Sequence, residues 1–375
     1  MASATFPALV LLMLVASASV FAQPGGGMGG GGGGGGCTGG GSGDCSGGGP
    51  GVNGGGMGGG GGPGSNSGGM TGMANPQGPG LSFSFYSESC PKAADIVAAR
   101  VYAAFKKDRG VPAPLLRLHF HDCFVQGCDA SVLLDSTSNN KAEKDADPNA
   151  TLGAFDVIDD IKAHLEAECP GTVSCADILA LAAREGVHLA GGPLTEVPLG
   201  RRDGLTSFAL AAETFLPGST LNVSGLVHNF ATVGLDILDV ATLSGAHTMG
   251  EARCVSLKNR LTQNDPTMNP EFAAYVKAKC GTSNISPKAM INNDYKTPSR
   301  FDNQYYKNLL ARAGLLTTDQ ALIYNRTTMR AVKVFAKKKS VFFKHFRRSV
   351  MKMGMITPLT GSQGQIRSNC HRVNA

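Results

Sequence analysis

Residues 117–131 read RLHFHDCFVQGCDAS, and this stretch decides how the chain is interpreted. Helical signals lead into it, so Arg117 and His121, four residues apart, are expected to share one helix face, with Phe120 beside them. A titratable imidazole next to a fixed cation suits a reaction that moves a proton and develops negative charge. The alternative is a buried Arg–His packing pair without a catalytic role.

The second half of the stretch supplies oxygen donors at short intervals. The donors are the side chains of Asp122, Asp129 and Ser131 and the backbone carbonyls of Val125 and Gly127. Hard oxygen ligands in a tight loop suit Ca²⁺, and Cys123 and Cys128 could clamp the same loop with a disulfide. His119 is interpreted as a packed structural histidine. A zinc or copper site at His119 and His121 is the alternative, but it lacks a third ligand nearby.

The chain divides into three parts before any motif is considered. Residues 1–22 form a short apolar run with small residues before Gln23, which is typical of a secretory signal peptide rather than a membrane anchor. Residues 23–80 hold 33 of the 52 glycines and are predicted to be a disordered extension. Residues 81–375 are long enough for a single large core or two lobes. No other segment is apolar enough to predict a membrane span.

Apolar residues at helical spacing dominate the folded part, which predicts an all-α domain. Alternating strand-like runs are few, and residues 195–203 (TEVPLGRRD) are expected to form at most a short hairpin arm. Helices are expected over residues 90–108, 155–169, 174–192, 235–247, 301–314 and 332–354.

Cysteine content and charge limit the compartment and the partners. Eight cysteines in the folded part, behind a signal peptide, indicate disulfides formed in an oxidising compartment, although the count alone leaves the pairing open. The net charge of +6 favours acidic surroundings such as anionic wall polysaccharide over nucleic acid. The basic run Lys337–Lys339, and Lys344 with Arg347 and Arg348, are interpreted as solvated helix faces.

At this point a family resemblance becomes specific. Residues 117–135 (RLHFHDCFVQGCDASVLLD) resemble the distal signature of the plant secretory (class III) haem peroxidases, and residues 243–250 (LSGAHTMG) resemble their proximal motif. Three more segments match in order, at residues 172–183, 191–203 and 357–367. The resemblance covers essentially all of residues 81–375. It implies a two-lobed, all-α fold with minimal β structure and a haem between distal and proximal helices.

The resemblance also implies a role for each residue that occupies a motif position. His247 would bind the haem iron, with Asp319 accepting its other N–H and Phe120 lining the haem site. The catalytic residues would be His121, Arg117, Asn149 and Glu143, and the Pro217 carbonyl would line the channel for aromatic donors. Asp177 and Arg201 would form a buried ion pair.

The resemblance further implies haem b and two calcium ions. The first calcium would use Asp122, Val125, Gly127, Asp129 and Ser131. The second would use Thr248, Asp294, Thr297 and Asp302, with help from the Arg300 carbonyl. The implied disulfides are Cys90–Cys169, Cys123–Cys128, Cys175–Cys370 and Cys254–Cys280. Surface glycan is expected at the sequons that begin at Asn222, Asn284 and Asn325, whereas burial should keep Asn149 unmodified.

The function that the resemblance implies is a secreted, monomeric peroxidase of the extracellular space or cell wall. It would reduce hydrogen peroxide and oxidise small phenolic donors in two one-electron steps. The alternative is a non-catalytic, glycine-rich wall protein with a structural peroxidase-like domain. The chain departs from the family where Thr195 replaces a usual tryptophan and where Asn293 replaces an apolar or aromatic residue near the proximal imidazole.

Overall fold

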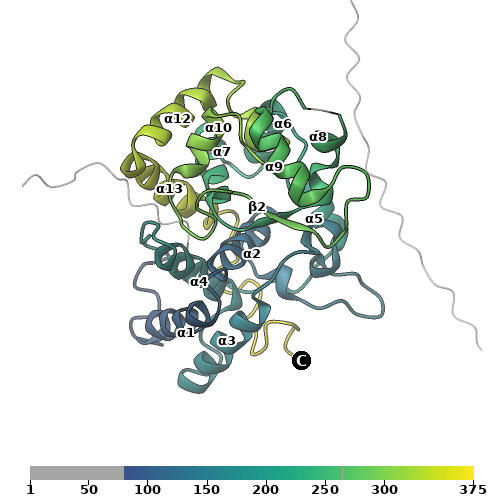
Figure 1. Ribbon diagram of the computed structural model, residues 1–375. Coiled ribbons are helices and arrows are strands. Elements are labelled where there is room, and N and C mark those ends of the chain that lie inside the picture. The colour runs from purple at the N-terminus through teal and green to yellow at the C-terminus, as the bar shows by residue number, and fades with distance from the viewer. Residues whose placement is uncertain (1–79, 264) are drawn as a thin grey trace, which may run out of the picture. The chain divides into compact units, whose positions relative to one another are not determined.

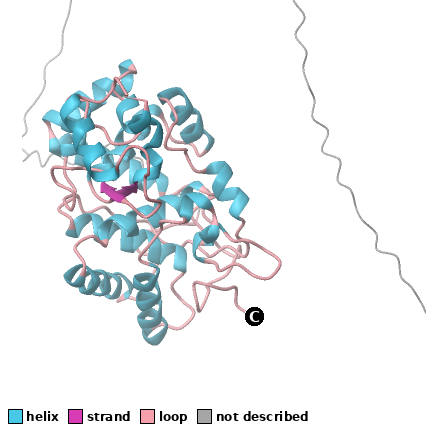
Figure 2. Cartoon of the chain, turned by 45° about the vertical axis from the view of Figure 1, so that its right-hand side comes forward, coloured by secondary structure: helices cyan, strands magenta, loops and turns pink. Residues whose placement is uncertain are grey.

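The computed structural model describes residues 80–263 and 265–375. The predicted signal peptide and the predicted extension up to residue 79 lie outside the described residues, as do Cys37 and Cys45. The described part is mostly helical, which confirms the all-α prediction. Figure 2 shows its strand structure as one small pair among the helices.

Four helices form the first core. They are α1 (Ala93–Lys107), α2 (Pro112–Phe124), α3 (Phe155–Glu168) and α4 (Cys175–Leu189). Apolar side chains at helical spacing, such as Val97 and Val101 of α1 and Leu115 and Leu118 of α2, are buried in this core, where α4 packs against both helices. The α4 helix begins where the Ser174 side chain accepts a hydrogen bond from the backbone N–H of Asp177, which caps the helix N-terminus.

A second, larger core lies on the other side of α2. Its helices include α6 (Val223–Thr232), α7 (Ile237–Leu243), α10 (Gln304–Leu310), α12 (Arg326–Lys337) and α13 (Lys339–Met353). Leu116 and Phe124 of α2 pack into this core, whereas Leu115 and Leu118 pack into the first one. Figure 1 shows α2 between the two groups of helices. The two-lobed prediction is therefore confirmed, and α2 is the helix that both lobes share.

Shorter elements complete the described chain. The remaining α-helices are α5 (Ala209–Phe215), α8 (Lys258–Thr262), α9 (Pro270–Cys280) and α11 (Thr317–Ala321). The 3₁₀ turns are η1 (Ser131–Leu133), η2 (Glu143–Asp145), η3 (Asp147–Asn149), η4 (Ser244–Thr248) and η5 (Cys254–Leu257). The two strands, β1 (Glu251–Arg253) and β2 (Met290–Asn292), pair antiparallel with Ala252 opposite Ile291.

Two local predictions were wrong. Residues 195–203 do not form a hairpin with themselves, because Leu199 bridges to Ser82 and Arg202 bridges to Leu359 instead. The helix expected over residues 332–354 is two helices, because Lys338 has an extended backbone (φ −130°, ψ 90°).

Four disulfides join segments that are distant in the chain or clamp a local loop. The bonds are Cys90–Cys169, Cys123–Cys128, Cys175–Cys370 and Cys254–Cys280. This is the pairing that the resemblance implied. Among the described residues, no single helix could span a membrane by length and composition; α6 followed by α7 and η4 passes that test only as a pair bent by 103°.

Candidate active site

Helix α2 brings the predicted acid/base pair together. The Arg117 Nε–H donates to His121 Nε2 at 3.2 Å, and the other Arg117 nitrogens donate to Thr151 and to the Pro148 carbonyl. Phe120 packs edge-on against the His121 ring, at 5.2 Å between ring centroids. Burial and the nearby Arg253 charge lower the pKa of Arg117 to about 10, so the guanidinium stays charged at neutral pH.

The His121 ring is fixed in one tautomer from the opposite side. Its Nδ1 lies 2.6 Å from Asn149 Oδ1, and the Asn149 amide donates to the Glu143 carbonyl at 2.7 Å. An amide oxygen can only accept, so the proton sits on Nδ1, and the lone pair on Nε2, which accepts from the Arg117 Nε–H, is the basic site of the ring. Burial, followed by the Arg117 charge, lowers the pKa of His121 to about 3. The imidazole is therefore a neutral base.

The second imidazole comes from a distant part of the chain. His247 lies on η4, and its Nδ1 is 2.8 Å from Asp319 Oδ1 on α11. Burial lowers the pKa of His247, but the Asp319 charge and hydrogen bond outweigh it and raise the pKa overall. His247 Nε2 makes no hydrogen bond within the described residues, and 39% of the side chain is exposed although Asp319 is buried.

These groups fit a haem on three observations from the described chain. His247 presents a ring nitrogen without a protein partner, which is the atom that an axial ligand needs. The Arg117 charge lowers the pKa of His247, which places the distal and proximal groups within electrostatic reach of each other. Phe120, Leu243 and Ala246 pack against the larger core while keeping part of their apolar surface open. Two imidazoles with partly exposed apolar side chains on the same elements suit a porphyrin.

The loop after α2 fits the first calcium. Both Asp122 carboxylate oxygens are buried and have no hydrogen-bond partner among the described residues. Burial, with Asp129 and Glu143 nearby, raises the pKa of Asp122 well above its usual value, and burial raises that of Glu143 to about 8. A buried carboxylate such as Asp122, which lacks donors and is repelled by Asp129 and Glu143, calls for a bound cation. Gly127 has φ +127°, and a Cβ there would lie 2.5 Å from the Thr357 carbonyl.

The second calcium set also converges. The Thr248 hydroxyl lies 3.4 Å from Asp294 Oδ2, 3.3 Å from Asp302 Oδ1 and 3.5 Å from the Arg300 carbonyl. Thr297 Oγ1 contacts the same two carboxylates at 3.1 and 3.3 Å. Each hydroxyl has one hydrogen and cannot satisfy all of these acceptors, so the oxygen-only cluster suits a hard cation.

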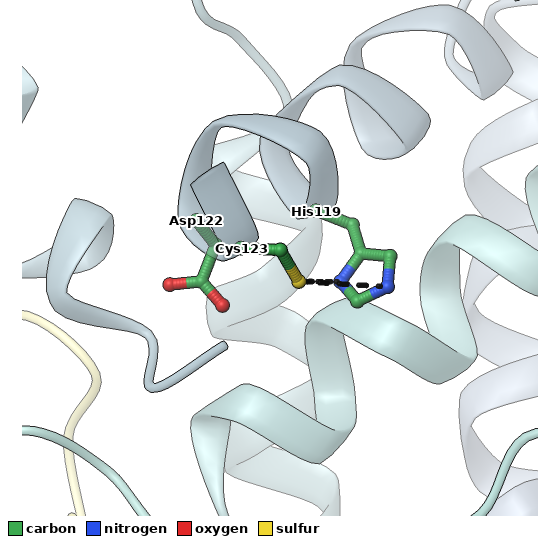
Figure 3. Close-up of side chains that lie close together, drawn as sticks. All are labelled: His119, Asp122 and Cys123. Carbon is green, nitrogen blue, oxygen red and sulfur yellow. Dashed lines mark hydrogen bonds between the residues drawn. The ribbon is translucent and has the colours of Figure 1, made fainter. Parts of the chain in front are cut away.

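The alternative transition-metal site is not supported. Figure 3 shows that Cys123 Sγ lies against the His119 ring, while the Asp122 carboxylate is directed away from it. Cys123 is bonded to Cys128 and therefore offers no thiolate to a metal. His119 is buried, and burial followed by the Arg201 charge lowers its pKa to about 3. It is a neutral packed histidine, as predicted.

The structure shows what surrounds Thr195 and Asn293, the two residues that depart from the family pattern. Thr195 borders a cavity of about 20 Å³ that is also lined by His119, Arg201 and Phe346, which is room for roughly one water molecule. Asn293 donates to the Met249 carbonyl at 3.2 Å, but its own side-chain oxygen is buried without a partner among the described residues. Pro217 follows α5 and is half-buried.

Sequence reasoning missed two side chains that act on the site. The Tyr305 hydroxyl donates to Asp319 Oδ1 at 3.0 Å, so this oxygen serves both Tyr305 and His247. Arg367 is fully buried and donates to the Ala130 carbonyl beside the first calcium loop, and its charge opposes the raised pKa of Asp122. Arg367 ends the matching segment 357–367, but nothing in the pattern predicts where its side chain lies.

Comparison with known proteins agrees with this geometry. A family model described as peroxidase matches residues 97–338. A cationic peroxidase SPC4 from Sorghum bicolor is 49% identical over 301 residues, covering 79% of this chain and 82% of that protein. Peroxidase 4 from Vitis vinifera is 46% identical over 78% of this chain and 92% of that protein, and peroxidase 72 from Arabidopsis thaliana is 44% identical over 77% and 88%.

The chain belongs to the peroxidase family, in its plant class III branch. It is a haem peroxidase, and the comparisons favour this enzyme over the non-catalytic wall protein. Membership implies haem, hydrogen peroxide and a reducing substrate, and four disulfides are typical of extracellular proteins.

Proposed function

We propose that this chain is a secreted, monomeric peroxidase of the cell wall that reduces hydrogen peroxide and oxidises small phenols in two one-electron steps. We further propose haem b between His121 and His247, and two calcium ions in the oxygen clusters described above. The observation that carries the proposal is shared by both imidazoles. Each is held at Nδ1 by a side-chain oxygen, at 2.6 Å for His121 and 2.8 Å for His247, which places the lone pair of each ring on Nε2.

The chain's own residues have separate tasks in this mechanism. His121 Nε2 accepts a proton from hydrogen peroxide and later returns it to the departing oxygen. The Arg117 guanidinium stabilises the negative charge on that oxygen. Asn149 holds the His121 tautomer, and Glu143 holds Asn149 through its backbone carbonyl. Bound haem would supply the iron and the redox chemistry.

The proximal side controls how the cofactor is held. His247 would bind the iron through Nε2, while Asp319 accepts the Nδ1 proton and increases the electron density of the ligand. Pro217 would present its carbonyl to phenolic donors. The net positive charge of the chain favours anionic wall polysaccharide as its surroundings.

The test is a set of variants in haem-loaded, calcium-loaded protein. The wild type should show a Soret band and peroxide-dependent guaiacol oxidation. His121→Ala should keep the band but slow peroxide consumption in stopped flow by several orders of magnitude, whereas His247→Ala should lose haem. His228→Ala, an exposed histidine on α6, is the matched control. Normal peroxide rates in His121→Ala would refute the assigned role, and folded wild type that refuses haem would refute the whole proposal.

A further inference from the structure

The positive charge of the chain is concentrated in one segment. Residues 320–375 contain twelve of the 34 Lys and Arg residues and none of the 28 Asp and Glu residues. The other 22 cations and 28 acids lie before residue 320, so residues 1–319 have a net charge of −6. The overall charge of +6 therefore comes entirely from the last 56 residues. A uniformly basic surface would not show this separation.

Helix α12 presents its cations on one exposed side. Arg326, Arg330, Lys333 and Lys337 follow one another at steps of three or four residues, so they share a helix face. All four are exposed, whereas Val332 and Phe335 on the opposite side are buried in the larger core. At about 1.5 Å per residue, the row extends for roughly 17 Å.

The row continues past the end of α12. Lys338 and Lys339 are exposed where the chain turns into α13, which packs against α12 (Figure 1). We call the four cations of α12 together with these two the basic face. Lys344, Arg347 and Arg348 add three exposed cations on α13. The break at Lys338 folds the single helix that the sequence predicted into two adjacent basic helices.

No carboxylate among the described residues pairs with the basic face. Cations elsewhere do have acidic partners, such as Arg100 with Asp160 and Lys352 with Asp239. Burial, followed by the charges of Arg348 and Lys344, lowers the pKa of His345 on α13, which indicates a positive local potential. Six clustered cations repel one another, so an anionic partner that bridges them would be favoured.

The chemistry of the face selects among anionic partners. Single-stranded nucleic acid stacks successive bases on several exposed aromatic rings. Here Tyr324 before α12 is exposed, but Phe335 and Phe342 are buried, and Phe343 is half-buried with the Lys339 ammonium over it. A membrane surface needs an exposed apolar helix side, yet the apolar side of α12 lies in the core. What remains is a row of separate ammonium and guanidinium groups, which suits a flexible polymer with spaced carboxylates.

We propose that the basic face binds a linear polycarboxylate polysaccharide, a polyuronate, and so holds the enzyme on an acidic matrix. The proposal rests on the secretion proposed above, because the polymer is extracellular, but it does not depend on haem or on turnover. The bound polymer would contact α12 and the turn at Lys338, not the residues of the candidate active site.

The experiment measures retention of the haem-loaded chain on immobilised polygalacturonate in a salt gradient, with neutral dextran as the reference matrix. The test variant is Arg330→Gln/Lys333→Gln/Lys337→Gln. The matched control is Lys258→Gln/Lys279→Gln/Lys288→Gln, which removes three exposed lysines outside the basic face. The test variant should bind polygalacturonate roughly tenfold to a hundredfold more weakly than the wild type. The control should stay within about twofold of the wild type, and all three proteins should oxidise guaiacol equally.

Several outcomes would overturn the proposal. Equal weakening of both triple variants would show that net charge alone drives retention, and unchanged binding of the test variant would remove the basic face from the interaction. Tighter binding to duplex DNA or to phosphatidylserine vesicles at the same ionic strength would assign a different partner. A wild type that binds polygalacturonate but has no peroxidase activity would refute the proposed function and leave this inference standing.

Discussion

Removal of calcium should make the stability of the protein depend on pH, and Glu143 should make one calculable contribution to the effect. Burial raises the pKa of Glu143 from 4.5 to about 8 in the ion-free fold. A carboxyl with a raised pKa keeps its proton in the folded state after the unfolded chain has lost it. Folding therefore becomes less favourable as the pH rises from about 4.5 to about 8. One pKa unit corresponds to about 1.4 kcal/mol, so Glu143 alone should cost roughly 3–4 kcal/mol between pH 5 and pH 8.

Asp122 and Asp129 act in the same direction, because burial raises the pKa of both carboxyls. A bound calcium ion stabilises the ionised carboxylates and should remove this loss. The assay is urea unfolding of calcium-loaded and chelator-treated protein at pH 5 and pH 8, compared as the difference between the two forms at each pH. Background titrations elsewhere in the chain cancel in that difference.

Two variants test the assignment to the first calcium loop. Glu143→Gln should reduce the pH-dependent loss in chelated protein by roughly 3–4 kcal/mol and leave the part that comes from Asp122 and Asp129. Glu213→Gln, an exposed glutamate on α5, should leave the loss unchanged. If chelated and calcium-loaded protein lose stability equally between pH 5 and pH 8, the buried carboxylates of this loop do not hold a cation and the reasoning is wrong.

Three further predictions concern single side chains. The Arg201 guanidinium is 1% exposed and lies 2.7 Å from Asp177 Oδ1, so Asp177→Asn leaves it without a counter-charge and should lower the free energy of urea unfolding by roughly 3–5 kcal/mol. Adding Arg201→Leu to the same chain should restore part of that stability. If the losses of the two single variants simply add in the double variant, the two side chains are not coupled. Ala154 has φ +63°, a backbone conformation that glycine adopts without strain. Ala154→Gly should therefore increase the free energy of unfolding by about 0.5–1 kcal/mol and raise the melting temperature. A lower melting temperature would show that the conformation is not strained. Tyr305→Phe removes one of two donors to Asp319 Oδ1, so this oxygen should accept more strongly from His247. The reduction potential of the haem iron, measured by spectroelectrochemistry, should therefore fall. An unchanged potential would show that Tyr305 does not act on His247 through Asp319.

Local spacing predicted those parts of the site that lie on one element. Arg117 and His121 are four residues apart on α2, so their contact follows from helix geometry. The oxygen donors of the first calcium loop lie within ten residues of each other and could be recognised from their intervals. The distant partners Asn149, His247 and Asp319 were placed by the family resemblance, since no local rule brings residues 247 and 319 together.

What the sequence left open depends on tertiary packing. The Tyr305 hydrogen bond requires α10 to lie beside α11. The local sequence FDNQYY predicts only that a helix begins there, not which residue the Tyr305 hydroxyl contacts. The break at Lys338 interrupts a continuous helical pattern without a glycine or proline to mark it. The strands β1 and β2 are three residues each and are separated by 36 residues. Three residues are too few for an alternating apolar and polar pattern to predict a strand.

The position of α2 has a consequence for how damage spreads through the enzyme. One side of this helix packs into the smaller lobe and another into the larger lobe, while Arg117, His121 and Asp122 project from the same thirteen residues. Repacking of either lobe would tilt or shift the helix as a whole. Core substitutions in either lobe, even far from any reacting atom, should therefore change the rate at which the enzyme reacts with peroxide.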